Sequence, residues 1–220
     1  MSYLPLAEVR KTLRVKWVRS PIEFARLREL SERSDVQGWI QAGGHLALWL
    51  FTGTLTFLLW SRQAWLGFAL ALFVHGTIAS FFVGVAPHEL GHGTVFRTKW
   101  LNKLFLYVYS LLSWWDPFDY ASSHTYHHRY TLYPRGDREN LLPLDPTLRW
   151  PHLLQLFTIN LFTPLGRTFG KGGLLPAVLA TIRGAFGRLG PTDIPANEWL
   201  QALHADQPEE HRRAIRWSRI

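Results

Sequence analysis

The sequence predicts an all-α integral membrane protein: a two-helix transmembrane hairpin with interfacial helices and a cytosolic, histidine-rich helical cap. Two long uncharged segments predict the hairpin. No Asp, Glu, Lys or Arg lies among the 26 residues between Asp35 and Arg62, or among the 26 between Arg62 and Glu89. About 20 apolar helical residues suffice to cross the hydrocarbon core of a bilayer. Histidines clustered at helical spacing near and after the end of the second segment predict the cap.

The first part of the chain holds the multi-pass membrane segment. Residues 1–35 are predicted as a cytosolic amphipathic segment and 36–88 as the hairpin, with helices at about 37–60 and 64–87. Pro87 is expected to kink the second helix or to mark its restart. Lys and Arg number eight in the first 35 residues, one between the apolar segments and fifteen after them. Because positive residues favour the cytosolic side, the N-terminus and the histidines are predicted to face the cytosol.

The rest of the chain is predicted as membrane-surface and cytosolic structure. Residues 89–150 form the histidine-rich region, in which the apolar stretch 101–115 is too short to span and is expected to lie in the interface. Residues 151–220 are predicted as an interfacial and connector region, with a second short apolar stretch at 151–165. The net charge of +8 fits contact with anionic membrane lipid. No basic–aromatic module indicates nucleic-acid binding.

Five of the ten histidines form two groups that indicate a metal centre. His88 and His92 are spaced i, i+4, whereas His124, His127 and His128 are spaced i, i+3, i+4, so each group lies on one helix face. The chain has no cysteine, which excludes disulfides, iron–sulfur clusters and thiolate ligands. Imidazoles alone suit zinc, copper or non-haem iron, and five of them indicate a dinuclear centre. We predict no catalytic residue separate from these ligands.

Both groups resemble the histidine boxes of membrane fatty acid desaturases. The segment PHELGHGTVFRTKWLN is similar to the first box of that family, and SSHTYHHRYTLYP is similar to the second, HxxHH. The resemblance covers roughly residues 36–145 and implies a non-haem di-iron centre held by all five histidines, with Glu89 a bystander. It also implies a fatty acyl or acyl-lipid substrate, O2 as oxidant, and an external electron donor such as a ferredoxin or cytochrome b5.

The family's third histidine box, another HxxHH after a second membrane hairpin, has no counterpart in the chain. Beyond His128 the chain carries only the isolated His152, His204 and His211. We therefore expect residues 1–220 to be the N-terminal part, or a truncated homologue, of a desaturase-like protein, ending before further transmembrane helices. Alone, they are expected to bind iron substoichiometrically and to be inactive.

Three alternative functions remain open from the sequence. A related di-iron lipid hydroxylase would carry the same two boxes. HELGH also fits the HExxH motif of zinc metalloproteases, in which two histidines bind zinc and the glutamate activates water, and Asp145 could then supply a further ligand. That interpretation leaves HTYHH without a role. The last alternative is a non-catalytic, truncated homologue that kept both boxes.

Overall fold

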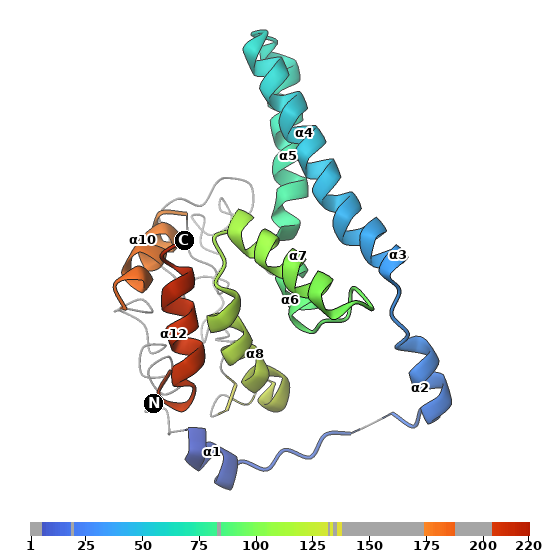
Figure 1. The fold of residues 1–220 in the computed structure, drawn as a ribbon, viewed down its shortest axis with the longest axis vertical. Helices are drawn as coiled ribbons and strands as arrows, with labels where there is room; N and C mark the ends of the chain where they lie inside the picture. The colour runs from blue at the N-terminus through green and yellow to red at the C-terminus, as the bar shows by residue number, and fades with distance from the viewer. Residues whose placement is uncertain are drawn as a thin grey trace, which may run out of the picture. The chain divides into compact units, whose positions relative to one another are not determined.

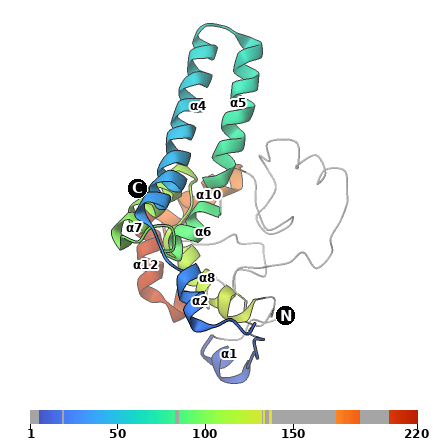
Figure 2. The same ribbon diagram turned by 90° about the vertical axis from the view of Figure 1, so that its right-hand side faces the viewer.

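The computed structural model describes most of the chain (Figures 1 and 2), namely residues 6–18, 20–82, 85–131, 133, 136–137, 174–187 and 204–220. Every regular element in these ranges is a helix, which confirms the all-α class for the described part. The predicted stretch 151–165 lies outside the described residues. The chain forms two compact units, Arg19–Pro117 and Met1–Val18 with Phe118–Ile220.

The first apolar run of the Arg19–Pro117 unit follows the short helix α2 (Phe24–Leu30). It passes without a break through α3 (Asp35–Gly38), the π-helical turn η1 (Trp39–Gly43) and α4 (Gly44–Ser61). Together these elements cover 27 residues. At about 1.5 Å per residue, the run is long and apolar enough to cross a membrane.

The second apolar run changes its helical geometry near its end. Helix α5 (Trp65–Ala79) continues into the 3-10 turn η2 (Ser80–Phe82), and the chain resumes as α6 (Val85–Gly91). The sequence predicts a kink or restart at Pro87, and helix α6 begins two residues earlier, at Val85. Pro87 thus lies in the first turn of α6, where its missing N–H costs no helical hydrogen bond. This run too is long and apolar enough to cross a membrane.

Helices α4 and α5 lie side by side (Figures 1 and 2), and each carries a histidine that makes a polar contact with the other helix. Thr52 Oγ1 lies 3.0 Å from His75 Nδ1, and His45 Nε2 lies 3.0 Å from the Ile78 carbonyl oxygen. Gly53 allows this approach, because a Cβ there would lie 3.0 Å from His75 Cε1. In hydrocarbon such pairing is needed, since an unsatisfied polar group costs several kcal/mol.

The core of this unit lies where α6 and η2 contact α7 (Lys99–Leu112), which forms over most of the apolar stretch 101–115. Helix α7 buries Leu101, Phe105 and Tyr109, at every fourth position. Its other face keeps several large apolar side chains exposed. A location in the membrane interface stays a prediction for α7.

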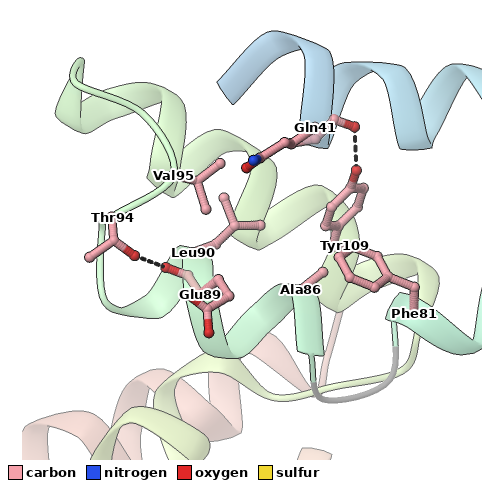
Figure 3. Close-up of a pocket in the computed structure, with 9 residues that line it drawn as sticks. Gln41, Phe81, Ala86, Glu89, Leu90, Thr94, Val95 and Tyr109 are labelled. Atoms are coloured by element: carbon pink, nitrogen blue, oxygen red, sulfur yellow. Dashed lines mark hydrogen bonds between the residues drawn. The ribbon is translucent and has the colours of Figure 1, made fainter. Parts of the chain in front are cut away.

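A cavity of about 240 Å³ opens beside this core (Figure 3). Its walls are mainly apolar and include Phe81, Ala86, Leu90 and Val95. Tyr109 closes one side, and its hydroxyl donates a hydrogen bond to a backbone carbonyl of η1. Burial raises the pKa of Tyr109 to about 12. Gln41, Glu89 and Thr94 add polar groups to the lining of the cavity.

The other unit is built around α8 (Pro117–Tyr130), which carries the second histidine group. Its buried face includes Tyr126 and Tyr130, and Val9 of α1 (Leu6–Thr12) packs against both rings. The Tyr126 hydroxyl also donates a hydrogen bond to the Asp206 carboxylate. The N-terminal helix of the chain therefore fixes the back of the histidine helix.

Two further helices lie in the part of the predicted connector region 151–220 that the structure describes. They are α10 (Leu174–Ala185) and α12 (Pro208–Trp217), which pack against each other (Figure 1). The frequent Gly and Pro residues around positions 174–185 predict a connector there rather than a helix. Pro176, however, lies in the first turn of α10, where proline is tolerated.

Candidate metal centre

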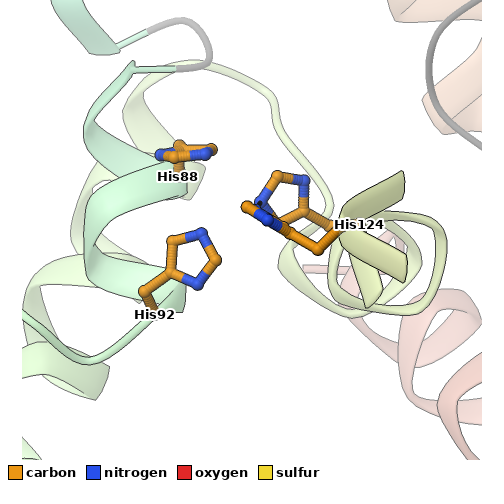
Figure 4. A group of neighbouring side chains, drawn as sticks. His88, His92 and His124 are labelled. Atoms are coloured by element: carbon orange, nitrogen blue, oxygen red, sulfur yellow. Dashed lines mark hydrogen bonds between the residues drawn. The ribbon is translucent and has the colours of Figure 1, made fainter. Parts of the chain in front are cut away.

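Helix α6 and the turn that follows it present His88 and His92 on the side away from the packed face of α6. Ala86 and Leu90 are buried in the core, whereas both imidazoles project from the other side of the helix (Figure 4). Their ring centroids lie 4.7 Å apart with planes at 80°. The i, i+4 spacing thus brings the two rings together, as the sequence predicts.

Gly93 ends the turn that carries His92. It adopts a φ of +65°, and its amide donates to the Leu90 carbonyl at 3.0 Å. A left-handed residue at this position stops a helix, and glycine adopts it without a Cβ clash. The Thr94 hydroxyl then donates to the Glu89 carbonyl at 3.1 Å, which folds the following chain back over α6 (Figure 3).

The loop after His92 is fastened at two further points. The Asn102 side chain accepts a hydrogen bond from the Phe96 amide at 3.0 Å and donates one to the Phe96 carbonyl at 2.8 Å. The amide and hydroxyl of Thr98 donate to the Asp35 carboxylate at 2.8 and 2.7 Å. The segment TVFRTKWLN is therefore a clamp that holds the end of α6.

Glu89 contacts its neighbour in the motif. Its Oε1 atom lies 2.7 Å from His88 Nδ1. Because an ionised carboxylate only accepts hydrogen bonds, Nδ1 donates in this pair. The contact leaves Nε2 of His88 as the nitrogen with a lone pair in the neutral ring.

Helix α8 brings His124 and His128 together in the other unit. Their Nε2 atoms lie 2.9 Å apart, and Tyr120 stacks on the His124 ring at 4.7 Å between centroids. Two nitrogens that each lie about 2.1 Å from one ion, at roughly 90° to each other, would be about 3 Å apart. The observed separation is the distance of an N–H···N hydrogen bond between the two rings, and it also matches the spacing of two ligands that share a metal ion.

His127 is oriented differently from its two neighbours on α8. Its Nδ1 lies 3.0 and 3.1 Å from the two carboxylate oxygens of Asp137. Asp137 could not be identified from the sequence. No spacing rule connects it with the histidines, and only the turn that follows α8 brings it back to His127.

A third group in this unit joins two of the histidines that are isolated in sequence. His204 Nε2 lies 2.8 Å from Asp119 Oδ1, and the His204 and His211 rings stack at 4.2 Å between centroids. Burial is the main cause that lowers the pKa of His211, and the nearby charge of His204 lowers it further. The stacked rings and the His204–Asp119 hydrogen bond connect the start of α8 with the C-terminal segment.

The donor chemistry of both boxes fits iron as well as zinc or copper. His88, His92, His124 and His128 each offer one ring nitrogen as a ligand atom, and His127 keeps Nε2 available. The chain has no thiolate to offer. Neutral imidazoles bind all three metals, and iron and copper, unlike the redox-inactive zinc, also support oxygen chemistry.

Comparison with known proteins identifies one family. The family model described as fatty acid desaturase matches residues 63–204, more than half of the chain and including both histidine boxes. No curated protein and no solved structure matches the chain.

Proposed function

This chain belongs to the fatty acid desaturase family, and on that premise we propose that it is a di-iron oxidoreductase that desaturates fatty acyl chains. One observation carries the proposal above all: two Nε2 atoms, of His124 and His128, converge within 2.9 Å on one helix face. We propose that His88, His92 and His127 complete the ligand set. A set of five imidazoles exceeds what one zinc ion of a protease needs.

In the proposed reaction, a –CH2–CH2– segment, O2, two electrons and two protons give –CH=CH– and two water molecules. Bound iron would supply the oxidising power to take hydrogen from an unactivated methylene. The electrons would come from a ferredoxin or a cytochrome b5-like partner. The related hydroxylation would use the same O2, electrons and protons to give an alcohol and one water.

An apolar substrate and a membrane location belong to the same proposal. Two helical runs are long and apolar enough to cross a membrane, and the cavity beside α6 has mainly apolar walls. The distribution of Lys and Arg supports placing both histidine groups on the cytosolic side. This background has no cysteine, so single cysteines can test the orientation. A cysteine at Arg62 should react with an impermeant reagent outside intact cells, whereas one at Glu32 should not.

The alternative of a zinc peptidase receives less support from the site. Glu89 contacts the neighbouring ligand His88, which is the role of a residue that orients a ligand. Asp145, the further ligand suggested for a peptidase, lies outside the described residues. A peptidase would also leave the convergence of His124 and His128 unexplained.

The test compares variants of the complete gene product that carries residues 1–220, called the full-length protein below, in a desaturase-deficient host that supplies an electron donor. We expect His92→Ala and His128→Ala to lose bound iron and unsaturated product together. Glu89→Gln should lose about 10–100-fold or less, as residues behind metal ligands typically do. His211→Asn is the matched histidine control and should keep both readouts. Peptidase activity that disappears with Glu89→Gln would overturn the proposal.

A further inference from the structure

Asp137 is a buried carboxylate that faces a predicted metal ligand. Its side chain is 1% exposed, and both of its oxygens lie within 3.1 Å of His127 Nδ1. A buried carboxylate is costly unless it is paired and hydrogen-bonded. Because an ionised carboxylate can only accept, Nδ1 of His127 must carry the hydrogen in this contact.

The backbone places Asp137 independently of its side chain. The amides of Gly136 and Asp137 both donate to the Tyr133 carbonyl at 2.9 Å, and the Tyr133 amide donates to the Tyr130 carbonyl at 2.8 Å. These bonds continue the end of α8 into a tight turn. This turn places the Asp137 carboxylate beside His127, which lies about one helical turn before the end of α8.

Gly136 shows how closely this turn is packed. A Cβ at Gly136 would lie 2.5 Å from Cγ of the Tyr130 ring and 2.9 Å from Cδ2 of Leu13. Tyr130 is itself buried against Val9. Only glycine fits between these groups, so the turn can approach α8 closely enough for Asp137 to reach the imidazole.

We propose that Asp137 is a positioning residue that holds His127 in the Nδ1–H tautomer with Nε2 available to the metal. This inference rests on the proposed function, in which His127 is a ligand. A neutral imidazole can carry its proton on either nitrogen, and a carboxylate on Nδ1 selects one tautomer, fixes the ring and makes the ligand more basic. Loss of such a partner typically weakens metal binding by about 10–100-fold.

The experiment measures metal binding and tautomer state in the full-length protein, purified in detergent and stripped of metal. Co2+ is the probe, because its visible spectrum reports imidazole ligation. Asp137→Asn keeps the shape of the side chain and removes its charge. We expect it to bind Co2+ about 10–100-fold more weakly, with a thermal midpoint in the metal-free state close to that of the unchanged protein.

Asp206→Asn is the matched control, because Asp206 also contacts α8, through Tyr126, but touches no histidine of the box. It should leave Co2+ affinity unchanged. A second measurement does not depend on how the variants fold: 15N spectra of histidine-labelled, metal-free protein should show His127 as the Nδ1–H tautomer. The Asp137→Asn variant should lose that preference.

The outcomes separate the inference from its premise. If His127→Gln binds Co2+ as tightly as the unchanged protein, His127 is no ligand and the proposed ligand set is wrong. If His127→Gln weakens binding but Asp137→Asn does not, only the positioning role is overturned. A predominant Nε2–H tautomer of His127 in the unchanged protein would also overturn that role.

Discussion

Replacing Asn102 by alanine tests how the loop after His92 is held. The Asn102 side chain makes two hydrogen bonds to the backbone of Phe96, each contributing about 1 kcal/mol net. Phe96 is fully buried, so its amide and carbonyl would lose partners that water cannot easily replace. Each buried group left in this way costs about 1–3 kcal/mol. We expect a loss of about 2–4 kcal/mol in the free energy of unfolding.

Two measurements check this value in detergent micelles. Denaturant titration gives the free energy of unfolding, and amide hydrogen exchange reports the opening at Phe96 itself. Exchange of the Phe96 amide should become at least about tenfold faster in Asn102→Ala, since about 1.4 kcal/mol corresponds to a factor of ten. Lys103→Ala, at the exposed neighbouring position, should change stability by about 0.5 kcal/mol or less. An unchanged exchange rate at Phe96 in Asn102→Ala would refute the clamp.

Three further changes probe other contacts. Gly38→Ala would place a Cβ 2.5 Å from the Phe96 ring and should lower the free energy of unfolding by about 1–3 kcal/mol. Gly44→Ala is the control, because the space around its Cβ is open, and it should leave the stability unchanged or raise it. Burial lowers the pKa of His211 from 6.5 in the folded protein. Below about pH 6.5 the unfolded state therefore binds a proton more readily than the folded state, and the free energy of unfolding falls as the pH drops. His211→Asn should therefore reduce the stability lost between about pH 8 and pH 5 in denaturant titrations. Tyr109→Phe should remove the phenolate absorbance step near pH 12, where burial places the pKa of Tyr109.

Local patterns predicted the long helices and the grouping of the histidines. An uncharged run and an i, i+4 spacing are properties of residues close together in sequence, so the structure they predict does not depend on contacts with distant segments. The same reasoning predicts that His88 and His92 share one helix face and that His124, His127 and His128 share another. The structure brings His88 to His92 and His124 to His128, whereas His127 contacts Asp137.

Contacts that depend on turns and on distant segments could not be predicted in this way. Asp137 reaches His127 only because Gly136 allows a tight turn against α8. Likewise, Gly38 lies against Phe96, which is far along the chain. Both glycines look like ordinary loop or helix residues in sequence, since the requirement for a missing Cβ arises from the partner and not from local propensity.

The two histidine groups share one structural solution. Each is carried by a helix and followed by a chain segment that turns back and is held by a buried polar side chain, Asn102 after the first group and Asp137 after the second. A metal site needs its ligands held within about 0.5 Å of their working positions, and supporting residues rather than the ligands themselves supply that rigidity. Weakening either support should therefore loosen metal binding even though every imidazole is retained. The loss should be largest for Asp137, because it contacts a ligand directly, whereas Asn102 acts through the backbone.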